Sequence, residues 1–193
     1  RAGAVVSLGH SDCSYDIALA AHRAGARLAT HLFNAMSQIG NREPGLAGAV
    51  LTSDLQVGII ADGIHVHPAT LRLALAAKPL GLFLVTDCMA FAGSRASELH
   101  LNGRLVRRQN GRLTLADGTL AGADLTMPQA IRTLITQADC PVERALAMAT
   151  SIPAALIGAG AGVLAPGGPA DLVQLSGDGS LLAVCNAGQW SKV

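Results

Sequence analysis

Three histidines and one aspartate stand where short apolar runs of the sequence end: His10, His31, His65 and Asp87. Imidazole nitrogens commonly bind divalent metal ions, and a carboxylate beside such an ion can act as a general base. A single histidine at a strand end is more often a hydrogen-bonded structural residue, but three in succession followed by an aspartate favour a site. We predict that His10 and His31 bind a metal and that Asp87 takes a proton from water, the purely structural alternative for Asp87 being a helix cap.

The elements that must position these residues repeat one pattern, in which a strand is followed by a polar residue and then by a helix. Parallel strands in such βα units bring their carboxyl ends to one rim, where barrel enzymes carry their chemistry. The pattern therefore predicts a parallel α/β layer. The predicted strands are Ala4–Leu8, Arg27–Ala29, Leu55–Ala61 and Gly81–Thr86. The predicted helices are Tyr15–Ala24, Leu46–Thr52 and Pro68–Ala77.

A long polar loop, residues 33–45, leaves the strand that ends before His31 and is suited to hold a ligand over this rim. Arg42 offers a fork of donors that fits a phosphate, and Asn34 with nearby backbone N–H groups could assist it. On position alone, an ordinary surface arginine is the more frequent case.

His65 follows Asp62-Gly63 at a strand end and could bind substrate or polarise a carbonyl. On a continued strand His67 would share a face with it and form a pair typical of zinc sites. Pro68, however, ends the strand and starts a helix, so we expect His67 in an exposed turn.

The pattern changes after Asp87. Three dipeptides that favour tight hairpin turns predict a small antiparallel meander over residues 98–123: Asn102-Gly103, Asn110-Gly111 and Asp117-Gly118. Helical periodicity returns at Met127–Ala138 and Val142–Ala149. We expect residues 1–161 to form the main α/β domain, with the meander as an insertion, and residues 162–193 to form a small β segment.

Composition and charge exclude several classes of protein. The 193 residues carry 14 Lys plus Arg against 13 Asp plus Glu, a formal charge of +1, so no preference for nucleic acid or an anionic membrane is predicted. Hydrophobic residues make up 50% and charged residues 14%, which excludes disorder. Prolines and glycines interrupt the longest uncharged stretch, so no transmembrane helix is predicted. Four scattered cysteines favour a reducing, cytoplasmic location over a disulfide scaffold.

Five motifs, in order along the chain, resemble those of the N-acetylglucosamine-6-phosphate deacetylases of the amidohydrolase superfamily. They are Gly9-His10-Ser11, residues 30–36 (THLFNAM), residues 42–48 (REPGLAG), residues 62–66 (DGIHV) and Val85-Thr86-Asp87. The resemblance spans essentially the whole chain, and residues 162–175 are similar to the closing β segment of many amidohydrolases.

The resemblance implies a metal-dependent hydrolase on a (β/α)8 barrel with a small β domain. The implied reaction converts N-acetylglucosamine 6-phosphate to glucosamine 6-phosphate and acetate. In this family His10 and His31 become metal ligands, for zinc first and otherwise for iron, cobalt or manganese. Asp87 becomes the base that activates water and then the acid that protonates the leaving amine.

The resemblance also assigns the substrate contacts. His65 would contact the sugar, while Asn34, the backbone of Ala35 and Arg42 would hold the phosphate. Enzymes of the family are commonly homodimers, in which the phosphate-binding arginine can reach in from the neighbouring subunit.

Only four βα units precede the meander, whereas a complete barrel needs eight strands. The sequence starts at Arg1 without an initiator methionine, so we expect the C-terminal half of a TIM-type barrel, strands 5 to 8, from a longer protein. The resemblance places the family's glutamate ligand on a missing N-terminal strand, which implies a poor enzyme in isolation. A half barrel exposes its edge strands, so we expect the missing half or a second copy to cover them.

Three other interpretations stay open. A related amidohydrolase could act on another N-acyl amino sugar phosphate, and a noncatalytic or truncated remnant could keep the fold and bind sugar phosphate. A phosphate-binding lyase fits less well, because neither Lys78 nor Lys192 stands at a predicted strand end, where it could form a Schiff base.

Overall fold

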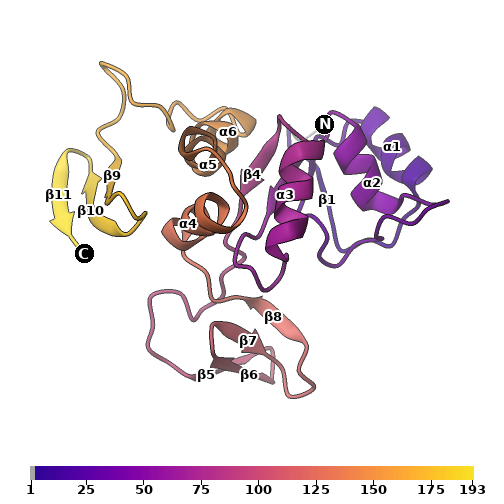
Figure 1. The fold of residues 1–193 in the computed structure, drawn as a ribbon, viewed down its shortest axis with the longest axis horizontal. Helices are drawn as coiled ribbons and strands as arrows, with labels where there is room; N and C mark the ends of the chain where they lie inside the picture. The colour runs from indigo at the N-terminus through magenta and orange to yellow at the C-terminus, as the bar shows by residue number, and fades with distance from the viewer. Residues whose placement is uncertain (1–2) are drawn as a thin grey trace.

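A parallel four-stranded sheet organises the first half of the described chain, residues 3–193 of a computed structural model (Figure 1). Its strands follow one another in chain order, and each neighbouring pair is parallel. The predicted succession of βα units is therefore confirmed. The strands are β1 (Ser7–Leu8), β2 (Leu28–Ala29), β3 (Gln56–Ile59) and β4 (Leu82–Leu84). The helices between them are α1 (Tyr15–Arg23), α2 (Gly45–Thr52) and α3 (Pro68–Ala77).

The strands are shorter than the apolar runs predicted, most of all at the sheet edge. The first strand was expected over Ala4–Leu8, but regular pairing covers only Ser7 and Leu8. Val5 and Val6 are 41% and 50% exposed, and β1 pairs on one side only within residues 3–193. The carbonyl of Val6 accepts from the N–H groups of both Arg27 and Leu28, at 3.1 and 3.2 Å, so regular one-to-one pairing with β2 begins only at Ser7.

Local signals start and end the helices within one residue of the predicted positions. The Ser14 hydroxyl accepts a backbone N–H at the start of α1, and Gly25, at φ 115°, follows its end. His67 caps α3 by accepting from the N–H of Ala69, while Pro68 occupies the first helical turn.

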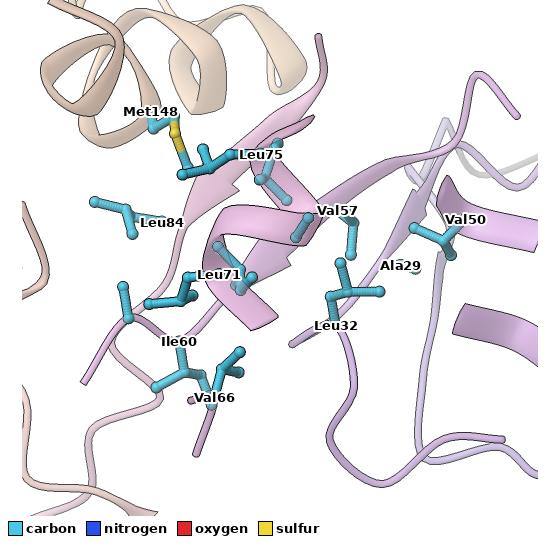
Figure 2. Close-up of a cluster of buried hydrophobic side chains, with 14 of the residues drawn as sticks. Ala29, Leu32, Val50, Val57, Ile60, Val66, Leu71, Leu75, Leu84 and Met148 are labelled. Carbon is cyan, nitrogen blue, oxygen red and sulfur yellow. The ribbon is translucent and has the colours of Figure 1, made fainter. Parts of the chain in front are cut away.

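The main core lies between the sheet and its helices (Figure 2). Leu71 and Leu75 of α3 belong to one buried cluster with Val57 of β3 and Leu84 of β4. Residues 45–50 of α2 are all buried, which explains why this helix is apolar throughout rather than amphipathic. The core thereby fixes the strands whose ends carry the predicted site.

The antiparallel meander predicted over residues 98–123 is confirmed. Its strands, in spatial order, are β5 (Glu98–Leu101), β6 (Arg104–Gln109), β7 (Arg112–Thr114) and β8 (Leu120–Ala123). Asn102-Gly103 and Asn110-Gly111 have positive φ at both residues, as tight two-residue turns require. The third predicted turn, at Asp117-Gly118, is also present, as a slightly longer connection. The N–H of Gly118 donates to the carbonyl of Leu115 at 3.0 Å, and the N–H of Leu115 donates to the carbonyl of Thr119 at 2.9 Å. Gly118 has the positive φ, 83°, and the Asp117 carboxylate accepts from the N–H of Thr119.

Three helices and a second antiparallel sheet complete the chain. They are α4 (Met127–Gln137), α5 (Val142–Ala149), α6 (Ser151–Leu156), β9 (Leu172–Leu175), β10 (Leu181–Asn186) and β11 (Gln189–Lys192). Helix α6 was not predicted, because Pro153 indicates a helix break. At the third helical position, however, the N–H that proline lacks would have had no intrahelical partner, so the helix loses no hydrogen bond there. The terminal sheet lies apart from the parallel sheet and reaches α4 where Arg132 is 3.6 Å from Asp178 (Figure 1). No helix in the described part of the chain has the length and hydropathy that a membrane crossing requires.

Candidate active site

His10 and His31 meet beyond the carboxyl ends of the neighbouring strands β1 and β2. Their Nε2 atoms lie 2.9 Å apart, and their ring centroids are 4.8 Å apart. His31 is buried, whereas His10 is exposed. The structure therefore brings these two predicted site residues together at one end of the sheet.

The facing nitrogens of His10 and His31 fit two ligand positions of a divalent ion. Without an ion they can share a hydrogen bond only if one ring is protonated at Nε2 and the other is not. The Nδ1 atom of His31 is buried and has no hydrogen-bond partner among the described residues. Within residues 3–193, no group of three or more His, Cys, Asp or Glu side chains is arranged to hold a metal. The pair thus supplies part of a metal site rather than a complete one.

The strand-end residues share an uncommon backbone conformation. The φ angles of His10, His31 and Asp87 are 47°, 25° and 49°, in the positive region that non-glycine residues rarely adopt. Such a conformation costs about 1–3 kcal/mol per residue and persists only where the surrounding structure enforces it. Gly9, just before His10, allows a close approach to the neighbouring strand end, because a Cβ there would lie 2.1 Å from Cγ2 of Thr30.

Asp87 follows β4, the last strand of the parallel sheet, and its side chain is exposed. Its carbonyl oxygen accepts from the N–H of Ala123 at 2.9 Å, and Cys88 forms an isolated bridge with the same residue. Asp87 therefore lies where the parallel sheet meets the meander. The alternative prediction of a helix cap is wrong, because the next regular element along the chain is the strand β5.

The loop over residues 33–45 carries the three predicted phosphate contacts. Arg42 and Ala35 are exposed. Asn34 is half-buried, and its amide donates to the carbonyl of Leu32 at 3.2 Å. Ala35, like the strand-end residues, has a positive φ, of 46°.

Glu43 and Ser37, which sequence reasoning missed, fasten this loop to the segment that follows His10. The Glu43 carboxylate accepts from the N–H groups of Tyr15 and Gly45, at 2.7 and 3.0 Å, and these bonds lower the pKa of Glu43. The Ser37 hydroxyl donates to the carbonyl of Cys13. An acidic residue just before a helix start is a local signal that could have identified Glu43.

His65 lies beyond β3 and is held by Asp62. Oδ2 of Asp62 is 2.6 Å from Nδ1 of His65, and Oδ1 accepts from the N–H groups of Ile64 and His65 at 2.8 and 2.7 Å. Both side chains are only 7% exposed. Burial acts to raise the pKa of Asp62, but the hydrogen bonds from His65 and Ile64 outweigh it and hold that pKa below its usual range. The carboxylate keeps the proton of the ring on Nδ1 and leaves Nε2 for a ligand.

The remaining histidine of this region and the cysteines lie outside these contacts. His67 is exposed and caps α3, so the predicted position in an exposed turn is confirmed. All four cysteines are free thiols: Cys88 is exposed, Cys13 is half-buried, and Cys140 and Cys185 are buried.

Lys78 lies before β4, at the end of the sheet opposite to the histidines. Its amine is buried and donates to the carbonyls of Val50 and Ser53 at 3.0 and 2.9 Å. Burial lowers the pKa of Lys78. These contacts give the lysine a structural role, which weakens the lyase interpretation further.

Residues 2–190 match the model of the amidohydrolase family. The N-acetylglucosamine-6-phosphate deacetylase of Haemophilus influenzae is 40% identical over 161 residues, covering 82% of this chain and 42% of that protein. The N-acetylgalactosamine-6-phosphate deacetylase of Shewanella sp. is 42% identical over 193 residues, covering 97% of this chain and 48% of that protein. The chain spans about half the length of the curated relatives it matches.

Solved structures of deacetylases are also similar to this chain. The crystal structure of N-acetylglucosamine-6-phosphate deacetylase from Pasteurella multocida superposes with a TM-score of 0.95 at 37% identity, over 99% of this chain and 51% of that one. A Mycobacterium smegmatis N-acetyl-D-glucosamine-6-phosphate deacetylase mutant, in complex with N-acetyl-D-glucosamine-6-phosphate, superposes with a TM-score of 0.90 at 37% identity, covering 97% and 51%. The resemblance carried by the five motifs is confirmed, and the chain belongs to the amidohydrolase family.

Proposed function

We propose that the protein containing this chain hydrolyses the acetamide of N-acetylglucosamine 6-phosphate to glucosamine 6-phosphate and acetate. The observation that carries the proposal is the pair of facing imidazole nitrogens of His10 and His31, 2.9 Å apart at the end of a parallel sheet. Relatives named as deacetylases of this substrate support it, such as the Haemophilus influenzae protein, which covers 82% of the chain.

In this proposal the parallel sheet is one arc, strands 5 to 8, of a (β/α)8 barrel. The strands follow in chain order, as in a singly wound barrel, whereas the strand order of a doubly wound sheet reverses. Residues up to 161 belong to the barrel, with the meander as an insertion, and residues 162–193 form a separate β unit. The exposed edge of β1, with Val5 and Val6, is where the missing half or a second copy would pair.

His10 and His31 would hold a divalent ion, and zinc suits imidazole ligands. When bound, such an ion supplies Lewis acidity toward the amide oxygen and makes a strong nucleophile available at neutral pH. The remaining ligands would come from chain outside residues 3–193, since no third side chain of suitable type joins the pair within them.

The other site residues bind the substrate and move protons. Asp87, exposed at the rim, would take the proton of the attacking water and return it to the leaving amine. His65 would meet the sugar through Nε2, because Asp62 occupies Nδ1. Arg42, Asn34 and the backbone of Ala35 would hold the phosphate and so orient the amide over the rim.

N-acetylgalactosamine 6-phosphate is a second candidate substrate. The Shewanella deacetylase named for that sugar is 42% identical and matches 97% of this chain. The two sugars differ only in the orientation of one ring hydroxyl, so the same metal pair, base and phosphate loop would serve both.

Acetate release tests the proposal on the full-length protein, loaded with zinc. We expect turnover of N-acetylglucosamine 6-phosphate and much weaker turnover of N-acetylglucosamine, which lacks the phosphate. Comparison with N-acetylgalactosamine 6-phosphate decides between the two sugars. Binding of the sugar phosphate without acetate release would favour the noncatalytic remnant.

Two variants separate metal binding from proton transfer. Asp87→Asn should lower kcat by about 10²- to 10⁴-fold and leave the metal content unchanged. His31→Asn should lower the metal content itself. Full activity of Asp87→Asn would show that Asp87 is not the general base and would contradict this mechanism.

A further inference from the structure

We propose that Arg108, in the meander, is a positioning residue that holds the loop over residues 88–97 and, through it, Asp87. This inference rests on the proposed function only for the catalytic role of Asp87. The contacts of Arg108 with the loop stand on the geometry alone.

Arg108 lies on β6 and reaches four acceptors. Nη1 donates to the carbonyls of Ser94 and Ala96 at 2.7 and 3.3 Å. Nη2 donates to the carbonyl of Phe91 at 2.7 Å and lies 2.9 Å from Oδ1 of Asp124. The guanidinium carbon is also 5.0 Å from the centre of the Phe91 ring. A planar guanidinium can serve several carbonyls at once, which a lysine ammonium cannot do in the same geometry.

The loop has few other anchors. Residues 92–95 are exposed, and no helix or strand is formed between β4 and β5. Phe91 is buried with Val106 and Leu113, and these three form a small buried cluster of their own among the described residues. Met89 and Ala96 also pack against this small cluster from the loop, but only partly buried. Arg108 thus adds polar anchors to a loop in which Phe91 alone is fully buried.

Arg108 contacts both chain segments that continue from the hydrogen bond between Asp87 and Ala123. The N–H of Ala123 donates to the carbonyl of Asp87, and Asp124, the next residue, forms the ion pair with Arg108. On the other side, Phe91 follows Asp87 by four residues and gives its carbonyl to the same guanidinium. Asp87 holds a φ of 49°, which needs such external support.

The surroundings leave the loop room to move if Arg108 is removed. A cavity of about 240 Å³ lies beside it and is lined in part by Cys88, Gly93, Arg108 and Gln129. Release of the loop would let residues 88–97 shift toward this space. Displacement of a catalytic group by about 1 Å can lower a rate by about 100-fold.

Arg107 is a matched control for Arg108. Neighbouring residues of a strand point to opposite faces, so Arg107 faces away from the loop. It is exposed and pairs with Glu98 at 2.9 Å. Arg107→Met and Arg108→Met therefore remove the same charge and one ion pair each, with Glu98 and with Asp124, and only Arg108→Met also removes the hydrogen bonds to the loop carbonyls.

The experiment compares full-length wild type, Arg107→Met, Arg108→Met and Arg108→Lys by amide hydrogen exchange and by the rate of thiol modification. We expect exchange within residues 89–97 to be about tenfold faster in Arg108→Met, with Arg107→Met like wild type. Cys88, the exposed thiol next to Asp87, should react faster in the same variant. Unchanged exchange and unchanged Cys88 reactivity would overturn the inference.

Acetate release by the zinc-loaded protein then tests the link to Asp87. Arg108→Met should lower kcat by about 10- to 100-fold with unchanged KM and metal content, and Arg108→Lys should recover part of it. A looser loop with full kcat would refute positioning of Asp87. Wild type without deacetylase activity would instead refute the proposed function, while the exchange data still decide whether Arg108 holds the loop.

Discussion

The parallel sheet and the meander hold chemical side chains by different means. The sheet shares one extensive buried core with its helices, and His10 and His31, with positive φ, follow strands that this core fixes. In the described part of the chain, the separate cluster of the meander buries three residues, Phe91, Val106 and Leu113. Besides this small cluster, the meander holds the loop after Asp87 by hydrogen bonds from Arg108, which itself forms an ion pair with Asp124.

This difference shows that the amount of buried apolar surface decides how each region holds its side chains in place. Burial of apolar surface contributes about 25 cal/mol per Å², so an extensive core can offset strain at its edges. A small core cannot do so alone. Charge-assisted hydrogen bonds, which are about twice as strong as neutral ones, fill that role in the meander.

The largest expected effect comes from truncating a core residue in each region. Leu71→Ala should lower the free energy of unfolding by about 2–5 kcal/mol, because it opens a cavity in the main core. Phe91→Ala should loosen the meander and its loop while the parallel sheet stays folded. Urea unfolding and hydrogen exchange measure the two outcomes. Equal loss of protection in the sheet for both variants would contradict the separation.

Asp62→Asn tests a polar anchor that belongs to the sheet region. The folded-state pKa of Asp62 lies below its usual value of 3.8, so the stabilisation is present above about pH 4 and is lost as pH falls through the folded pKa. We expect a loss of about 1–3 kcal/mol at pH 7, since bonds to a buried charge are removed. Unfolding curves at pH 7 and pH 3 check this. A difference between wild type and variant that does not shrink at pH 3 would argue against the charge.

Gly122→Ala tests how closely the meander approaches Asp87. A Cβ at Gly122 would lie 2.9 Å from the carbonyl oxygen of Asp87 and 2.6 Å from Cγ of Met89, at a φ of 73°. Gly118→Ala is the control, since its φ is 83° but no atom lies within 4 Å of the added carbon. Both should lose about 1–2 kcal/mol to backbone strain. Only Gly122→Ala should also slow acetate release. Equal rates for the two variants would show that the contact between Gly122 and Asp87 does not affect the reaction.

Glu98→Gln is expected to have the smallest effect. The Arg107–Glu98 pair is 61% and 53% exposed, so its loss should change the free energy of unfolding by less than about 1 kcal/mol and less still in high salt. Asp124→Asn removes the partner of Arg108, where the two side chains are 21% and 27% exposed, and should have the larger effect. Thermal unfolding of both variants at low and high salt measures the difference.

Much of the fold could be predicted because its signals are local. Apolar runs, caps and breakers marked α1, α3 and α5, and two asparagine-glycine pairs marked the hairpin turns of the meander. The predictions failed for α6 and for the start of the first strand, where the surrounding structure outweighed the local sequence signal. Pro153 was tolerated in the first turn of α6, and the regular pairing with β2 did not extend to Val5 and Val6.

Less of the candidate site could be predicted. Motif spacing identified His10, His31 and His65, because each follows a strand of a repeated unit. Arg108 gave no such signal. It acts through carbonyl groups, and the sequence does not show which carbonyls a side chain will reach.

The sequence alone determined which residues could do chemistry and in what order the strands and helices carry them, because residue type and hydrophobic period are properties of short segments. Only the tertiary structure decided that Nε2 of His10 and Nε2 of His31 lie 2.9 Å apart and that a meander arginine holds the loop after Asp87. Those contacts join residues distant in the chain. Their geometry is therefore set by how whole layers pack against one another.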